Sequence, residues 1–166
     1  MWAADVMTRD VVALSPGMTV EEAAERLVQG GISGAPVVDD RGRLVGILSE
    51  SDILRQLKRI AEETLGKRYL TNRVHSLDLL AFLGEREHEA VEEVYRRLRR
   101  SRVSEVMTRH VQSVKPTDSL ENVAAAMIEH DVNRLPVVDA GRVVGIITRA
   151  DLARVLATGR KDVPRL

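Results

Sequence analysis

Residues 46–52 read Gly-Ile-Leu-Ser-Glu-Ser-Asp, and residues 145–151 read Gly-Ile-Ile-Thr-Arg-Ala-Asp. In both stretches an apolar run meets a hydroxyl residue that is followed, three positions later, by Asp. Two other pieces recur around them: Val-Met-Thr-Arg at 6–9 and 106–109, and Pro-Val-Val-Asp at 36–39 and 136–139. Two copies of a unit this small predict two similar halves that bury apolar faces against each other. We expect a ligand to bind along the pseudo-twofold seam between the halves.

Each copy predicts the order strand, helix, strand, strand, helix. In the first copy we expect a strand at 11–14. A helix follows, which begins with a capping box of Thr19 and Glu22 and ends at Gly30-Gly31. Strands at 36–38 and 44–48 then form a hairpin that is buried on both faces. A second helix begins after Ser49. Apolar stripes are expected at Val20, Ala23, Ala24, Leu27 and Val28, and, after a Ser119 cap, at Val123, Ala124, Met127 and Ile128. The predicted fold class is α/β (α+β), with two βαββα repeats related by a pseudo-twofold axis.

The repeat leaves a helical insertion unexplained. We predict a first repeat at 1–57, the insertion at 58–102 and the second repeat at 103–166. Gly66 is expected to stop a helix, Leu77, Leu79, Leu80, Phe82 and Leu83 to form a short helical cluster, and residues 86–100 to form a helix. In this last helix the spacing predicts ion pairs of Glu92 with Arg96 and of Glu93 with Arg97.

Composition argues against several function classes. The chain has 166 residues, zero formal net charge, 2% aromatic residues and no cysteine. It therefore offers no general attraction to nucleic acid or to an acidic membrane, no base-stacking platform and no thiolate metal site. It shows no leader and no apolar run of bilayer length, so a soluble cytoplasmic protein is predicted. The histidines share no metal-ligand spacing and no acid–base pair is evident, so neither a metal site nor an enzyme is expected.

The repeated Ser/Thr-x-x-Asp block can carry binding chemistry. A helix start offers unpaired amides and a partial positive charge for a phosphate, and the hydroxyl of Ser49 or Thr148 can donate to a phosphate oxygen. The carboxylate of Asp52 or Asp151 can accept from both hydroxyls of a ribose. The same residues also make an ordinary helix cap, and a duplicated gene would duplicate a cap as well. From the residues alone, both interpretations stand.

The ordered motifs resemble those of cystathionine-beta-synthase (CBS) domains, which occur in tandem as a Bateman module. The matching pieces are the Val-Met-Thr opening, the Pro-Val-Val-Asp strand, the Gly-Arg-hydrophobic-Val-Gly hairpin and the Ser/Thr-x-x-Asp helix start, each found twice. The resemblance implies a non-catalytic regulatory module for energy sensing, with no cofactor. It would bind an adenine nucleotide (AMP, ADP or ATP) in clefts between the repeats, form a homodimer and act on a protein partner not identified by the sequence.

The resemblance also implies which residues would form two clefts. The first cleft would use Thr8, Val12, Ala13, Ile32, Ser33, Asn133, Arg134, Thr148, Ala150 and Asp151. The second would use Thr108, Gln112, Ser113, Val132, Ser49, Ser51 and Asp52. Because Gly34 stands where the second copy has Arg134, we expect the cleft that contains Asp151 to bind phosphorylated adenosine more tightly.

Three alternatives remain open. The duplicated caps can be structural, in which case the chain is a protein-interaction scaffold whose insertion docks a partner. The ligand can be S-adenosylmethionine instead of a nucleotide. The arginine run Arg96, Arg97, Arg99, Arg100 and Arg102 can bind nucleic acid, although the interleaved glutamates favour a solvated helix face.

Overall fold

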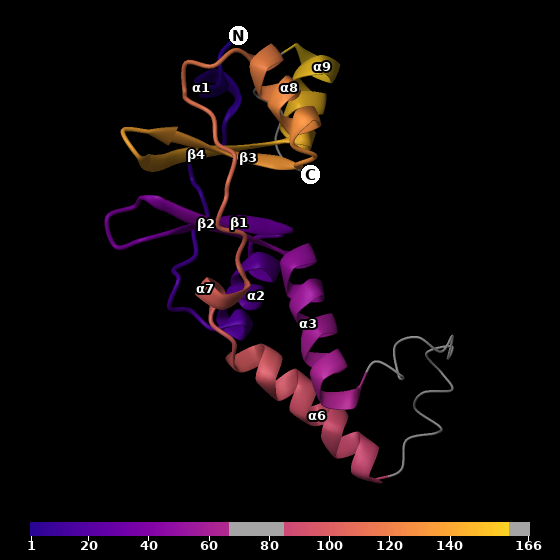
Figure 1. Cartoon of the computed structure of the whole chain (residues 1–166). Coiled ribbons are helices and arrows are strands. Elements are labelled where there is room, and N and C mark those ends of the chain that lie inside the picture. The colour runs from indigo at the N-terminus through magenta and orange to yellow at the C-terminus, as the bar shows by residue number, and fades with distance from the viewer. Residues whose placement is uncertain (67–84, 160–166) are drawn as a thin grey trace. The chain divides into compact units, whose positions relative to one another are not determined.

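The computed structural model describes residues 1–66 and 85–159 (Figure 1). This part of the chain divides into two units, each assembled from separate stretches. The first unit takes Met1–Ser15, Ala35–Ile47 and Thr108–Leu166, and the second takes Pro16–Gly34 and Leu48–Met107. Both units therefore contain segments of both sequence copies. The predicted cluster at 77–83 lies outside the described residues.

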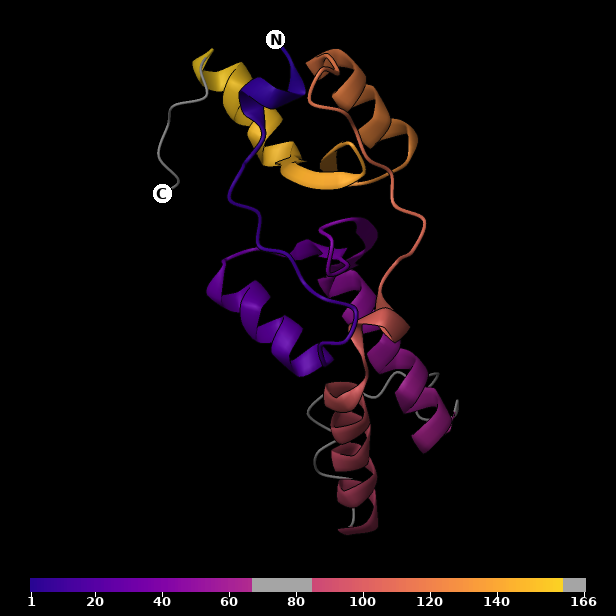
Figure 2. The same cartoon turned by 90° about the vertical axis from the view of Figure 1, so that its left-hand side faces the viewer.

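In the first unit, two helices cover one side of a hairpin. The hairpin consists of β3 (Arg134–Asp139) and β4 (Arg142–Thr148), which pair antiparallel. Both views place α8 (Leu120–Glu129) and α9 (Arg149–Thr158) on the same side of it, with the short α1 (Ala3–Val6) nearby (Figure 1, Figure 2). Ser119 starts α8 as predicted, because its hydroxyl accepts the backbone N–H of Asn122 at 3.3 Å. The core between hairpin and helices is aliphatic: Met7, Val114, Val123, Met127, Leu135, Val137 and Ile147 are all buried.

The equivalent hairpin of the first copy is β1 (Gly34–Val38) with β2 (Leu44–Ser49). Gly42 turns it with a φ of +76°, and Asp39 accepts the Arg43 guanidinium Nε at 2.7 Å, which lowers the pKa of Asp39. β1 is buried along almost its whole length, as predicted, whereas β2 buries only Gly46 and Leu48. The prediction of burial on both faces is therefore wrong for β2.

The strand predicted at 11–14 is also wrong. Only Leu14 pairs, in an isolated parallel bridge to Val37, and its N–H donates to the carbonyl of Pro36 at 2.9 Å. Val114 makes the same kind of bridge to Val137 in the second copy. An apolar run of this length looks like a strand in the sequence. Which of its residues pair with a neighbouring strand depends on a distant segment, and the run itself does not reveal that.

The opening segments of the two copies cross over. Thr8 of the first copy exchanges backbone hydrogen bonds with Ile146 on β4 of the second copy, at 2.9 and 3.0 Å. Thr108 of the second copy exchanges hydrogen bonds with Ile47 on β2 of the first, both at 2.9 Å. Each hairpin is therefore extended by the other copy.

The second unit is helical. It contains α2 (Val20–Gln29), α3 (Glu50–Leu65), α6 (Glu85–Arg100) and the short α7 (Val103–Val106). The Thr19–Glu22 capping box, the end of α2 at Gly30, the stop at Gly66 and the helix predicted at 86–100 are all confirmed. α3 and α6 lie side by side, and Val20, Ile60, Val94 and Leu98 form a buried core between the helices (Figure 1).

Two predictions about helix surfaces need correction. Arg96 pairs with Glu93 at 2.7 Å, and Arg97 pairs with Glu63 of α3 at 2.8 Å, so the two pairs predicted within α6 are wrong. Arg97 reaches a carboxylate on the neighbouring helix that helical spacing alone cannot reveal. Val28 and Ile128, which end the two predicted apolar stripes, are 81% and 79% exposed.

Among the described residues, no helix combines the length and the apolar character that a bilayer span requires.

Candidate functional site

Thr148 and Asp151 form a reciprocal cap where β4 runs into α9. The Thr148 hydroxyl accepts the backbone N–H of Asp151 at 3.3 Å. Oδ2 of Asp151 accepts both the backbone N–H of Thr148, at 2.8 Å, and its hydroxyl, at 2.7 Å. Asp151 is only 4% exposed, and a buried carboxylate is stable only where hydrogen bonds or a counter-ion compensate its lost hydration.

An arginine supplies that counter-ion. Oδ1 of Asp151 accepts Nη1 of Arg154 at 2.9 Å, so both carboxylate oxygens are occupied within the first turn of α9. The first copy repeats the arrangement: Asp52 accepts from the backbone and hydroxyl of Ser49 and pairs with Arg55. Neither arginine was predicted from the sequence. The Asp-x-x-Arg spacing, present in both copies, is the signal that identifies them.

Thr8, Arg134 and Thr148 lie on one face of the first unit. Arg134 is the direct register partner of Thr148 across the β3–β4 hairpin, and Thr8 bridges Ile146 on the other edge of β4. Side chains alternate along a strand, so Ile146 and Thr148 point away from the side on which the buried Ile147 packs against the helices. The structure thus brings a hydroxyl from the first copy and a cation and a hydroxyl from the second to the same face.

The other predicted residues of the first unit surround this face less closely. Asn133 accepts the backbone N–H of Arg149 through its carbonyl at 3.0 Å, and Val132 accepts Nε of Arg149 at 3.3 Å. Ala150 is exposed in the first turn of α9. Val12, Ala13, Gln112 and Ser113 lie in the extended segments before the bridge residues Leu14 and Val114, and Thr108 lies against β2.

The remaining predicted residues belong to the second unit. Ser33 accepts the backbone N–H of Glu50 through its carbonyl at 3.0 Å, and Ile32 precedes it. Ser49, Ser51 and Asp52 lie at the start of α3. The two copies differ where Arg134 stands, because the first copy has the buried Gly34 there at the start of β1.

Within the described ranges, histidines, aspartates and glutamates form no group of three or more that could hold a metal ion. The polar groups at the face are hydroxyl, guanidinium, carboxylate and helix-start amide groups. These groups suit a ligand that carries both hydroxyls and negative charge.

Comparison with known proteins points to one family. The model of the CBS domain matches residues 3–59 and 103–158. Uncharacterized protein MJ1426 of Methanocaldococcus jannaschii is 32% identical over 92% of this chain and 89% of its own length. The CBS domain of a CBS domain-containing membrane protein from Sphaerobacter thermophilus is 32% identical, with a TM-score of 0.68 over 93% of this chain and 86% of that one. The structure of CBSX2 in complex with AMP is 26% identical, with a TM-score of 0.66 over 94% of this chain and 96% of that one. The two matches cover both sequence copies, and the chain belongs to the CBS domain family.

Proposed function

We propose that this chain is a non-catalytic sensor that binds an adenine nucleotide (AMP, ADP or ATP) at the face that holds Thr8, Arg134, Thr148 and Asp151. The observation that carries the proposal is the bridge between Thr8 and Ile146, because it puts a residue of the first copy beside the Thr-x-x-Asp helix start of the second. The likeness to CBSX2, which was solved in complex with AMP, supports the choice of ligand. The expected adenine neighbours Ile32 and Ser33 stay a prediction.

Each group has a definite role in this proposal. The carboxylate of Asp151 accepts the two ribose hydroxyls, and the Thr148 hydroxyl, the first amides of α9 and Arg134 meet the phosphate. Because Arg154 occupies Oδ1 of Asp151, the ribose displaces this guanidinium when it binds. The released Arg154 guanidinium can then form an ion pair with the phosphate.

We propose that the corresponding site around Asp52 binds phosphorylated ligands more weakly. Gly34 offers no side chain in the place of Arg134, so one phosphate contact is missing. Hydrogen bonds that involve a charged group contribute roughly 1.5–3 kcal/mol each, which corresponds to a difference of about tenfold or more in affinity.

Calorimetric titration tests the proposal. AMP, ADP, ATP and S-adenosylmethionine are titrated into the purified chain and into the variants Asp151→Asn and Asp52→Asn. We expect Asp151→Asn to weaken the tighter nucleotide site by about ten- to a hundredfold, because an amide accepts the ribose hydroxyls less strongly than a carboxylate does. Asp52→Asn is the matched control and should leave that site unchanged. Loss of the tighter site in Asp52→Asn, or no response to any nucleotide, contradicts the proposal.

A second candidate function is a ligand-free interaction scaffold. The observation that favours it is that both oxygens of Asp151 are already bonded within the chain, as a purely structural cap requires. A scaffold predicts no heat with any of the four ligands, and a bound protein that is lost when residues 67–100 are deleted.

We also propose that two copies form a homodimer through helix faces. Val28 and Ile128 occupy equivalent positions at the ends of α2 and α8, and both are strongly exposed. Val28 borders an apolar hollow that Ala24, Ile53 and Leu98 also line. An exposed apolar side chain on each of these helices gives each unit a surface against which a second chain can pack. A nucleotide that binds residues of both copies would then bias the geometry that the dimer presents to a partner.

A further inference from the structure

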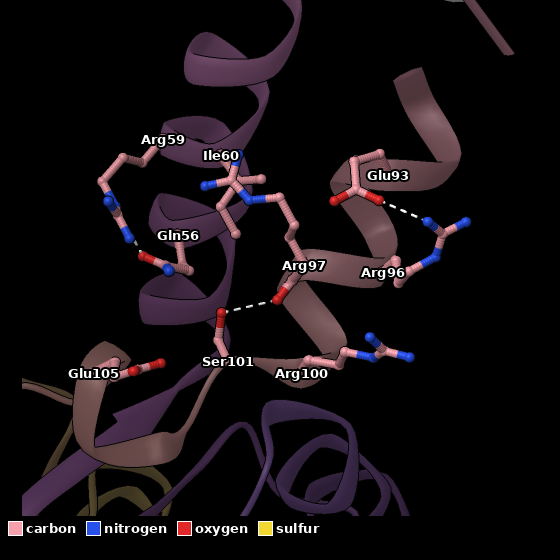
Figure 3. A pocket seen from close by; sticks show the side chains of 9 residues that line it. All are labelled: Gln56, Arg59, Ile60, Glu93, Arg96, Arg97, Arg100, Ser101 and Glu105. Atoms are coloured by element: carbon pink, nitrogen blue, oxygen red, sulfur yellow. Dashed lines mark hydrogen bonds and ion pairs between the residues drawn. The ribbon is translucent and has the colours of Figure 1, made fainter. Parts of the chain in front are cut away.

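The second unit contains a polar hollow that belongs to neither Ser/Thr-x-x-Asp helix start. It has a volume of about 540 Å³ and lies between α3 and the C-terminal half of α6, with α7 at one end (Figure 3). Its lining residues are Gln56, Arg59, Ile60, Glu93, Arg96, Arg97, Arg100, Ser101 and Glu105. A volume of this size is within the range of about 300–1,000 Å³ typical of small-molecule sites.

Positive charge exceeds negative charge around the hollow. The carboxylate of Glu63 bridges two of the guanidinium groups, since its Oε1 accepts from Arg59 and its Oε2 from Arg97, both at 2.8 Å. One carboxylate between two guanidinium groups leaves one positive charge. Arg100 adds a second, because it has no ion-pair or hydrogen-bond partner in the part of the chain that the structure describes.

The carboxylates of the lining are already engaged. Glu93 accepts from Arg96 at 2.7 Å, and Glu105 accepts the backbone N–H of Arg102 at 2.8 Å. Glu105 carries the one negative charge that opposes the two positive ones. Ser101 donates its hydroxyl to the carbonyl of Arg97 at 3.0 Å, which ends α6 and leaves the guanidinium groups as the main donors (Figure 3).

A purely structural role explains the arginines around the hollow but does not explain Gln56. Cations in the last turn of a helix stabilise its dipole, so the arginines of α6 would occur there without a ligand. Gln56, however, is 92% buried, and its Oε1 accepts Nε of Arg59 at 3.1 Å. Within residues 1–66 and 85–159 its amide nitrogen has no acceptor, although the side chain lines the hollow. The second copy has Val155 at the equivalent position, so the fold of the repeat does not need an amide there.

From this juxtaposition we infer that the hollow is a further anion site, separate from the two proposed nucleotide sites, which binds the phosphate group of a small phosphorylated metabolite. The amide of Gln56 and the guanidinium groups of Arg97 and Arg100 donate to the phosphate oxygens, and Arg59 holds Gln56 in place. Charge-assisted hydrogen bonds from several guanidinium groups are the usual means of phosphate recognition.

The geometry favours a small molecule over nucleic acid. The donors line one hollow between two helices and come from both of them, whereas a strip along α6 would involve that helix alone. Glu92 and Glu93 lie one turn before the arginines of that helix, and the formal net charge of the chain is zero. A nucleic-acid surface draws its affinity from many phosphates along a track, which this arrangement does not provide.

Titration with inorganic pyrophosphate tests the inference on the full chain. The informative variants are Arg100→Gln, which removes the unpaired cation, and Gln56→Met, which keeps the length and helix propensity of the side chain but removes its polar atoms. Arg99→Gln is the matched control, because Arg99 is the neighbouring arginine of α6 and does not line the hollow. We expect Arg100→Gln and Gln56→Met each to weaken pyrophosphate binding by about tenfold or more, and Arg99→Gln to leave it unchanged.

Three outcomes overturn the inference. The first is absence of pyrophosphate binding in the millimolar range. The second is equal weakening by Arg99→Gln and Arg100→Gln, which would indicate a diffuse basic surface. The third is displacement of pyrophosphate by a single-stranded RNA whose affinity falls steeply with salt. Thermal unfolding of each variant verifies that it is folded. Asp151→Asn separates this inference from the proposed nucleotide site, because it should weaken AMP binding and leave pyrophosphate binding at the hollow intact.

Discussion

Asp151 makes three kinds of contact with a single carboxylate: a backbone amide, a hydroxyl and a guanidinium. The amide and the hydroxyl share Oδ2 and hold the helix start together. The guanidinium of Arg154 donates to Oδ1, and its side chain is 30% exposed, so it is the contact that the proposed ligand would replace without dismantling the cap. The exposed counterpart Arg55 stands in the same relation to Asp52.

Replacement of Arg154 tests this division of roles. In the proposed nucleotide complex of Arg154→Gln, the ribose would no longer compete with a bound cation, but the phosphate would lose a nearby guanidinium. We therefore expect adenosine to bind more tightly than it does to the unchanged chain. The ratio of the adenosine dissociation constant to the AMP dissociation constant should fall by about tenfold. Titration of both ligands measures the ratio. Arg142→Gln, at the opposite end of β4, is the control, and an unchanged ratio in Arg154→Gln would contradict the role.

Gly145 illustrates how tightly the first unit packs around the crossing segment. A Cβ at Gly145 would overlap the side chain of Met7, which is 2% exposed. We expect Gly145→Ala to lower the free energy of unfolding by about 1–3 kcal/mol, the usual cost of overpacking a core. Gly17→Ala, where a Cβ meets nothing within 4 Å, should change it little. Denaturant unfolding measures both, and equal stability of the two variants would contradict the packing argument.

At the scale of elements, α3 and α6 are joined by a buried apolar seam and by Glu63, which contacts Arg97 across the two helices. The Arg97 side chain, and to a lesser degree Arg59, lowers the pKa of Glu63 below its usual value of 4.5. The contribution of this contact is therefore fully present above about pH 4.5 and is lost as the pH falls and the carboxylate takes up a proton.

Amide hydrogen exchange in α6 follows this contact. We expect Glu63→Gln to lower the protection factors (the intrinsic exchange rate divided by the measured rate at the same pH) in the C-terminal half of α6 at neutral pH. It should also remove part of the loss of protection that we expect for the unchanged chain when the medium is acidified. Glu62→Gln is the matched control, because within the described residues the Glu62 carboxylate pairs only with Lys58 of its own helix, at 3.9 Å. Equal exchange in both variants would indicate that the apolar seam alone holds α6.

Local chemistry explains which elements could be predicted from the sequence. Caps and stops depend on neighbours in the chain, so Thr19, Ser119 and Gly66 indicated the ends of the helices correctly. Contacts between distant segments were beyond this reasoning. The pairing of Arg97 with Glu63 and the single bridge at Leu14 depend on partners that no local pattern specifies. The site was anticipated in its hydroxyl and carboxylate, but the arginine that neutralises Asp151 and the hollow beside Gln56 were not.

At the scale of the whole molecule, the proposed homodimer depends on the exposed ends of α2 and α8. We expect Val28→Glu and Ile128→Glu each to shift the chain from dimer to monomer, because a charge buried in an apolar interface is costly. Light scattering over a range of concentrations measures the shift. Glu25→Gln on α2 is the control for the mere change of charge on this helix. A dimer that persists in both glutamate variants would place the interface elsewhere.

The crossed opening segments have a further consequence for biosynthesis. Thr8 leaves the ribosome long before the strand residue that completes its backbone pairing, Ile146, which belongs to the second repeat. A nascent chain that carries the first repeat alone therefore exposes an unsatisfied edge until the second repeat has been synthesised, since contacts of such wide sequence separation form late. Dividing the gene between the repeats would yield two polypeptides that each lack a strand partner. We expect co-expression of the two polypeptides to restore the backbone pairing of Thr8 with Ile146 and of Thr108 with Ile47.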